Sequence, residues 1–226
     1  ARILQTAGFP ENKIHTIYYG VEQNIFKPGD KSDARKKLNL PQTAPIILFV
    51  GNFLPIKGLL LTIESFNTLV KKYRLNNPLL ILIGSGPLYK KLKQKALSLG
   101  IANNIIFAGT KTPQDIATYM QSADALCLTS INEGVPNVVL EALSTGLPVV
   151  TTRVGGIPEI ITDDNLGKMI TERSPELIAD SIYQVINNPP DKNHLINHSR
   201  RYDWNKTAQE YINLLGKSVA DFRSAK

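Results

Sequence analysis

Residues 46–58 read IILFVGNFLPIKG. The first five, Ile46–Val50, are uninterruptedly apolar, which is typical of a strand covered on both faces of a parallel sheet. Gly51 and Gly58 bound a short loop, and the amphipathic stretch 59–73 has the length of a helix. The sequence here therefore predicts a strand, a loop and a helix, which is the repeating unit of an α/β fold.

The same unit recurs along the chain. Five more apolar runs of strand length follow, at Leu79–Ile83, Ile105–Ala108, Ala125–Thr129, Pro148–Thr151 and Gly167–Ile170. Stretches of helix length come after them, at 88–99, 114–121, 136–145, 157–161 and 175–186. The alternation predicts a Rossmann-like α/β fold, a doubly wound parallel sheet of about six strands with helices on both faces. Ligands bind such sheets beyond the carboxyl ends of the strands, so a site is expected in the loops that follow them.

The chain divides into three predicted parts. Residues 1–45 are irregular and are expected to form an interdomain segment, with a short strand at 13–18 and a short helix at 32–38. Residues 46–190 form the Rossmann-like domain, and residues 191–226 supply C-terminal helices at 193–201 and 205–217. The chain starts without Met or a signal peptide, so we expect a fragment of a longer protein.

Composition limits the class of protein. With 226 residues and 42% hydrophobic residues, the chain can bury a sizeable core. Its single cysteine, Cys127, excludes a disulfide framework and is expected to be a small core residue in a reducing compartment. No apolar run approaches the ~18 residues of a membrane span.

Positive charge is concentrated in three clusters, at 35–37, 71–74 and 90–95, and the net charge is +7. Solvated helix faces are the favoured interpretation of these clusters. Attraction to anionic lipid or to a phosphorylated ligand is the alternative. Nucleic acid is not indicated, because no binding module accompanies the lysines and aromatic residues make up 7%.

Lys57 ends the first loop, close to the start of a helix, where the helix dipole disfavours a cation unless an anion shares the site. Lys57 and the free N–H groups of the helix start could hold a diphosphate, or Lys57 could extend into water. Thr112, in a later loop, is expected to cap a helix with Asp115 three residues on.

Residues 130–142, SINEGVPNVVLEA, form the most informative loop and helix. Glu133 precedes the helix beside the N–H groups of Gly134 and Val135, over the strand ends. Glu141 lies on the polar side of the helix, where an ordinary solvated face is the alternative. Two carboxylates that accept from hydroxyls beside a phosphate site suit a polyhydroxylated, phosphorylated ligand. No metal site is expected, because His15, His194 and His198 are scattered and suit surface or capping positions.

Taken together, these motifs resemble the retaining group 1, or family 4, glycosyltransferases from about residue 12 to about residue 217. The most specific element is the glutamate pair Glu133 and Glu141 in EGVPNVVLEA. Four further motifs resemble the family, NIFKP at 24–28, GLPVVTT at 146–152, GGIPE at 155–159 and YDW at 202–204.

The resemblance implies the C-terminal, donor-binding half of a GT-B enzyme without a metal cofactor. The diphosphate and sugar would contact a set of loop residues, namely Gly51, Asn52, Lys57, Glu133, Gly134, Val135 and Asn137. Glu141 would hold the ribose, and Thr110 and Lys111 would edge the base. Asn52 stands where many members carry arginine, and an amide is a weaker phosphate partner than a guanidinium.

The implied activity is retaining transfer from a nucleoside-diphosphate sugar, with a UDP-sugar favoured by family frequency, to a glycan or lipid-linked acceptor. Lys57 and Glu133 would be catalytic. A missing N-terminal domain would hold the acceptor, so this chain alone is expected to be inactive. The parent protein is expected in the cytoplasm, in peripheral contact with the anionic inner membrane face. The alternatives are a non-catalytic nucleotide-sugar-binding module and a GT-B sugar-nucleotide epimerase.

Overall fold

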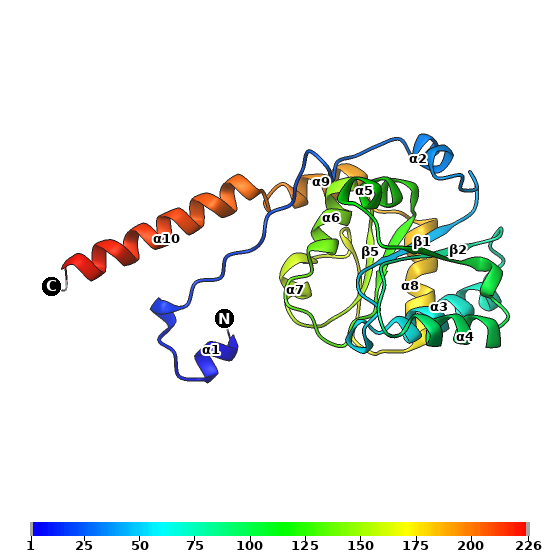
Figure 1. Cartoon of the computed structure of the whole chain (residues 1–226), viewed down its shortest axis with the longest axis horizontal. Helices are drawn as coiled ribbons and strands as arrows, with labels where there is room; N and C mark the ends of the chain where they lie inside the picture. The colour runs from blue at the N-terminus through cyan, green and yellow to red at the C-terminus, as the bar shows by residue number, and fades with distance from the viewer. Residues whose placement is uncertain (1, 225–226) are drawn as a thin grey trace.

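Within residues 2–224, which the computed structural model describes, the core is one parallel sheet between two layers of helices (Figure 1). Its six strands lie in the order β3-β2-β1-β4-β5-β6. Their bounds are β1 (Ile46–Val50), β2 (Leu79–Ile83), β3 (Ile105–Gly109), β4 (Ala125–Leu128), β5 (Val149–Thr152) and β6 (Gly167–Ile170). The predicted doubly wound fold is confirmed.

The central strands are apolar because both of their faces are covered. All of β4 and β5 and all of β1 except Val50 are buried, and Cys127 on β4 is a core residue as predicted. Burial raises the pKa of the Cys127 thiol to about 12, so it stays protonated and packs as a small apolar side chain.

The helices pack in two groups on the sheet. One group contains α3 (Leu59–Lys72), α4 (Tyr89–Ser98) and α8 (Pro175–Asn187), with α3 between the other two. The other contains α2 (Lys31–Lys37), α5 (Pro113–Ser122), α6 (Asn137–Thr145) and α9 (Lys192–Ser199). The short α7 (Ile157–Ile160) follows β5. Strand order reverses between β1 and β4, so the crossovers on either side of this point run to opposite faces.

The segment before the sheet differs from its prediction. Residues 13–18 form no strand; Lys13 ends a 3-10 turn, and Ile14 to Ile17 line a groove against the C-terminal helix α10 (Trp204–Ser224). A short segment does not form a strand when no neighbouring strand is available to pair with it. The short α1 (Arg2–Thr6) and a 3-10 turn (Glu11–Lys13) precede this segment.

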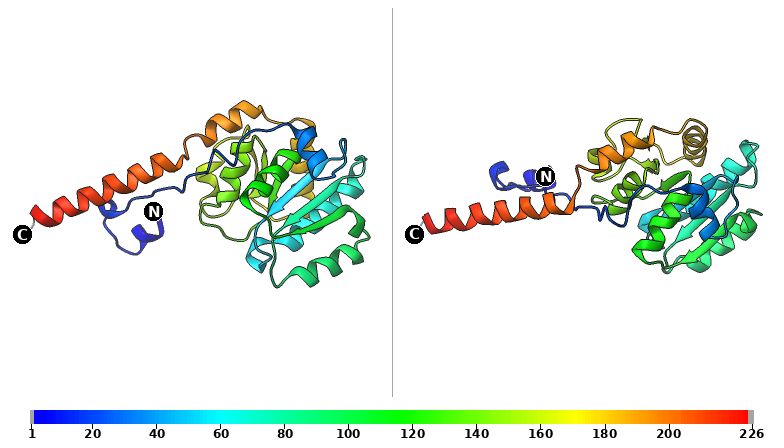
Figure 2. Two further views of the ribbon diagram at one scale, coloured as in Figure 1. Left: turned by 45° about the horizontal axis from the view of Figure 1, so that its top comes forward. Right: turned by 90° about the horizontal axis from the view of Figure 1, so that it is seen from above.

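Helix α10 is longer than predicted and projects away from the sheet (Figure 2). Several of its large apolar side chains are exposed, including Tyr211, Ile212, Leu215 and Val219. Of the helices described, none is both long and apolar enough to cross a membrane.

Two expectations about charged and titratable residues need correction. Arg35, in the first basic cluster, is 3% exposed rather than solvated, and it donates to Asp124 and to the carbonyls of Ser122 and Gln42. His198, expected at the surface or at a cap, is 6% exposed, and burial lowers its pKa. Both side chains pack between elements that are far apart in the sequence.

We predict that Asp124→Ala lowers the free energy of unfolding by about 2–3 kcal/mol in urea denaturation, because it leaves Arg35 buried without its counter-ion. The backbone N–H of Ile46 loses its acceptor as well. Asp33→Ala, which removes an exposed pair with Lys36, is the control and should cost less than about 1 kcal/mol. Equal losses in the two variants would contradict the prediction.

Candidate functional site

Lys57 and Glu133 meet at the point where the strand order reverses. The Lys57 Nζ lies 2.7 Å from Glu133 Oε1 and 2.9 Å from Oε2, and Ser130 Oγ donates to Oε1 at 2.6 Å. The Glu133 side chain is 8% exposed and that of Lys57 is 25% exposed. The structure therefore joins the loops after β1 and β4 through an ion pair in a partly enclosed setting.

Backbone contacts hold these two loops together. The Ile131 N–H donates to the carbonyl of Ile56, and Thr129 Oγ1 donates to that of Gly58. Gly58 has a φ of 68°, and a Cβ there would lie 2.0 Å from the Thr129 carbonyl oxygen. Glycine at this position thus allows the approach that brings Lys57 to Glu133.

Phe53 fixes the β1 loop from the other side. Its side chain is fully buried, and its backbone exchanges hydrogen bonds with Ser85 and Leu88 in the neighbouring loop. Gly84 and Gly86 give it room, since a Cβ on Gly86 would lie 2.8 Å from the Phe53 backbone. The Gly84–Pro87 turn is therefore a packing feature of the site's frame.

Helix capping differs between the centre and the edges of the sheet. The helices that follow the edge strands, α5 and α8, are capped by Thr112 and Ser174, as predicted for Thr112. By contrast, the helices that follow the four inner strands, α3, α4, α6 and α7, begin without a side-chain cap. Of these, α3 and α6 follow the adjacent central strands β1 and β4 and have no acidic residue in the first turn. Their uncapped N–H groups and dipoles favour an anion between them.

The loop before α6 presents further donors. Among the described residues, the N–H groups of Gly134 and Val135 have no hydrogen-bond acceptor. Helix α6 begins at Asn137, one residue later than predicted, because Pro136 has an extended ψ of 115°. Asn137 is exposed beside these donors.

Glycines after β5 support this loop. The Gly156 N–H donates to the Gly134 carbonyl, and a Cβ on Gly155 would lie 1.7 Å from the Glu133 carbonyl oxygen. The GGIPE segment thus buttresses the loop that carries Glu133.

Glu141 lines a separate cavity of about 200 Å³ rather than a solvated helix face. The cavity is bounded by Gly20, Val21, Glu22, Phe26, Pro113, Ile116, Asn137, Glu141 and Trp204. Burial, and secondarily the charge of Glu22, raise the pKa of Glu141 to about 7. This volume is small for a whole ligand of nucleotide size, so the cavity suits one part of such a ligand.

The remaining predicted residues lie around these two centres. Gly51 follows β1 with a φ of 153° and donates its N–H to the Ile83 carbonyl, and Asn52 is exposed. Thr110 and Lys111 are also exposed, and neither lines the Glu141 cavity. From this part of the chain, Pro113 and Ile116 line it. The structure thus brings Lys57, Glu133, Gly134 and Val135 into one centre and places Glu141 in the other.

Sequence reasoning missed Ser130, Arg173 and Glu22. Ser130 follows β4 three residues before Glu133, a spacing that could have indicated the contact. Arg173 Nη1 donates to the carbonyls of Thr129 and Ser130, at 2.6 and 2.8 Å. Glu22 and Glu141 are far apart in the sequence and line the same cavity only because of the fold, so no local sequence pattern indicates Glu22.

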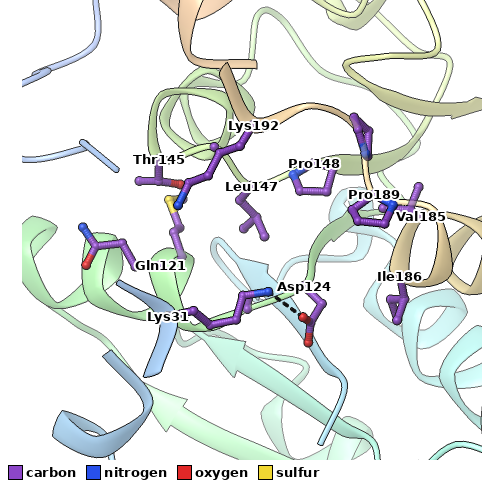
Figure 3. Close-up of a pocket in the computed structure, with 14 residues that line it drawn as sticks. Lys31, Gln121, Asp124, Thr145, Leu147, Pro148, Val185, Ile186, Pro189 and Lys192 are labelled. Atoms are coloured by element: carbon purple, nitrogen blue, oxygen red, sulfur yellow. Dashed lines mark hydrogen bonds and ion pairs between the residues drawn. The ribbon is translucent and has the colours of Figure 1, made fainter. Parts of the chain in front are cut away.

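A further cavity of about 270 Å³ lies at the opposite ends of the strands (Figure 3). It contains the ion pair between Lys31 and Asp124, 2.8 Å apart, with Lys192 on another side. Asp124 also accepts from Arg35 and from the Ile46 N–H, so its oxygens are engaged in holding the fold.

Comparison with known proteins identifies the family. The model of the protein family described as "Glycosyl transferases group 1" matches residues 30–202. The chain belongs to this family. A D-inositol 3-phosphate glycosyltransferase of Corynebacterium urealyticum is 29% identical over 215 residues, covering 89% of this chain and 50% of that protein. The chain spans about half the length of the curated relatives it matches.

Solved structures show which half of a group 1 enzyme this is. The C-terminal domain of the LpcC protein of Francisella tularensis is 25% identical, with a TM-score of 0.67 over 85% of this chain and 98% of that one. The Anabaena Alr3699/HepE structure, in complex with UDP, has a TM-score of 0.83 at 23% identity, over 96% of this chain and 61% of that one. The chain therefore matches the C-terminal half of GT-B enzymes.

No group of three His, Cys, Asp or Glu side chains suited to a metal ion occurs within the part of the chain that the structure describes. The expected independence from metal stays a prediction.

We predict that Gly155→Ala lowers the free energy of unfolding by at least about 2 kcal/mol, because its φ of 56° and the Glu133 carbonyl both exclude a Cβ. Gly134→Ala is the matched control. No heavy atom lies within 4 Å of a Cβ there, so the change should be less than about 1 kcal/mol. Chemical denaturation of both variants measures the difference, and a tolerated Gly155→Ala would contradict the buttressing role.

We also predict that Glu141→Gln removes a pH-dependent loss of stability. A pKa raised to about 7 means that the folded state binds more protons than the unfolded state between about pH 4.5 and 7, so stability falls as pH rises through this window. Relative to the parent, the variant should gain about 2 kcal/mol between pH 5 and pH 8, since one pKa unit is about 1.4 kcal/mol and the carboxyl is only partly enclosed.

Urea denaturation at both pH values measures this gain. Glu22→Gln should produce a smaller change of the same sign, because burial is the larger cause of the shift. An unchanged pH dependence in Glu141→Gln would place the carboxyl in solvent.

Proposed function

We propose that this chain is the donor-binding half of a retaining glycosyltransferase and holds a nucleoside-diphosphate sugar, with a UDP-sugar favoured. The observation that carries the proposal is the Lys57–Glu133 pair between the uncapped N-termini of α3 and α6. The Anabaena relative was solved in complex with UDP-glucose, which supports the choice of donor.

The diphosphate would lie between Lys57 and the free N–H groups of Gly134 and Val135. Its charge would compete with Glu133 for the Lys57 ammonium, and the released carboxylate would accept from the hydroxyls of the sugar. Glu133 therefore changes partner when donor binds, while Ser130 keeps it oriented. Gly51, Asn52 and Asn137 would complete the contacts to diphosphate and sugar.

The nucleoside would extend from the diphosphate toward the Glu141 cavity. Glu141 would accept from the ribose hydroxyls, and the base would lie along the loop that contains Thr110 and Lys111. An ionised carboxylate is the better acceptor for two hydroxyls, so ribose binding favours loss of the Glu141 proton near neutral pH.

In the transfer step, the bond between the anomeric carbon and the β-phosphate oxygen breaks. The acceptor hydroxyl oxygen bonds to the same face of that carbon, and its proton passes to the departing phosphate. Lys57 and the N–H groups stabilise the charge that grows on the phosphate, and Glu133 orients the sugar. The acceptor, a glycan or a lipid-linked molecule, would be held by a preceding domain, so residues 46–190 serve as the donor unit.

We predict that calorimetric titration shows selective binding of UDP over GDP and ADP, and that Lys57→Ala and Glu141→Ala each weaken it at least about tenfold. Lys72→Ala is the matched control, because it also breaks a lysine ion pair, with Asp180, on another part of the surface. It should leave UDP affinity unchanged.

Weakening by Lys72→Ala as well would show a general charge effect rather than a site. Failure of all three nucleotides to bind would overturn the proposed donor site.

A further inference from the structure

The exposed face of α4 differs from the other basic surfaces of the molecule. The helix carries Lys90, Lys91, Lys93 and Lys95 in its ten residues and has no acidic residue. Lys95 pairs with Glu64 of α3. Within residues 2–224, Lys90, Lys91 and Lys93 have no acidic partner, so three ammonium groups remain uncompensated.

The other two basic clusters are more strongly tied to acidic partners. In the first, Arg35 is buried against Asp124 and Lys36 pairs with Asp33. In the second, Lys72 pairs with Asp180. Of the three, the α4 cluster presents the largest uncompensated charge on a single helix.

Apolar side chains stand among these lysines. Leu97 is 67% exposed and Tyr89 is 40% exposed, while Leu92 and Ala96 on the other side of α4 are buried in the core. Residues 90, 93 and 97 follow the spacing that places side chains on one side of a helix. Lys93 lies over the Tyr89 ring, 5.1 Å from its centroid, and over Phe107 at 5.9 Å.

The position of α4 leaves this face open. The helix lies over the edge of the sheet formed by β2 and β3, at the end of the molecule away from α10 (Figure 1). Its lysine stems can lie along an apolar boundary while the ammonium groups reach anionic head groups. Leu97 and Tyr89 are suited to the zone between head groups and acyl chains.

We propose that the exposed face of α4, centred on Lys90, Lys93 and Leu97 and flanked by Tyr89 and Lys91, docks the protein on an anionic lipid bilayer. The lysines supply attraction to anionic head groups, and Leu97 inserts at the interface. A soluble acidic polymer would bind through charge alone, so its affinity would not depend on Leu97. The inference does not depend on which nucleotide the proposed donor site holds.

The test is co-sedimentation of the full chain with vesicles of phosphatidylcholine alone or mixed with phosphatidylglycerol. Binding is expected to the mixed vesicles and not to the neutral ones, and it should weaken as salt is added. Changing Lys90, Lys91 and Lys93 together to Gln should weaken vesicle binding at least tenfold. Each lysine near an anionic surface raises the affinity for the membrane about fivefold. Leu97→Ser should weaken it about threefold or more, because an inserted apolar side chain is lost.

The control changes Lys27, Lys36 and Lys37 together to Gln, which gives the same net charge while leaving α4 intact. It should keep most of the binding. Circular dichroism and UDP titration check that each variant is folded, so a failure of membrane binding is distinguishable from a failure of the donor site.

Three outcomes would overturn the proposal. They are equal loss in the control and in the α4 variant, binding to neutral vesicles, and a Leu97→Ser variant that binds normally while dextran sulfate competes fully. The last result would assign the surface to a soluble polyanion.

Discussion

The reversal of winding between β1 and β4 is the constraint on which the site depends. Because one crossover leaves β1 for one face and the next leaves β4 for the other, the two loops separate and their helices begin on opposite sides of a crevice. Lys57 and Glu133 come from these two loops and meet across the crevice. A strand order that separated β1 from β4 would place them over different parts of the sheet.

The pattern of helix caps follows the same geometry. Capping side chains stabilise helix starts by about 1 kcal/mol, and the chain uses them where helices follow the edge strands. It omits them at the helices that follow the inner strands, including α3 and α6 beside the two loops. The centre of the sheet thus gives up some stability and keeps backbone donors free for a ligand.

Much of the fold could be predicted because burial on both faces leaves continuous apolar runs, and the six predicted strands match those observed within one residue at each end. The strand predicted at residues 13–18 is wrong, because a short segment forms a strand only where a neighbouring strand pairs with it. Local spacing predicts Glu133 in the loop over the strand ends, and the structure pairs its carboxylate with Lys57 and Ser130. Glu22 and Arg173 could not be found this way, because each reaches its site through packing between segments far apart in the chain.

This arrangement bears on how the proposed site would bind a diphosphate with Asn52 in place of an arginine. In the proposed function, the usual second cation beside the diphosphate is absent, and the charge of Lys57 is matched by Glu133 before donor binds. Attraction for a diphosphate must then rest on the N–H groups at the starts of α3 and α6 and on the exchange of partners by Lys57. The affinity of such a site for a diphosphate depends little on long-range charge. It depends mainly on the positions of the donors, because each donor acts only at hydrogen-bond distance. The buttress formed by Gly155 and Gly156 is therefore as necessary to the proposed donor site as the lysine itself.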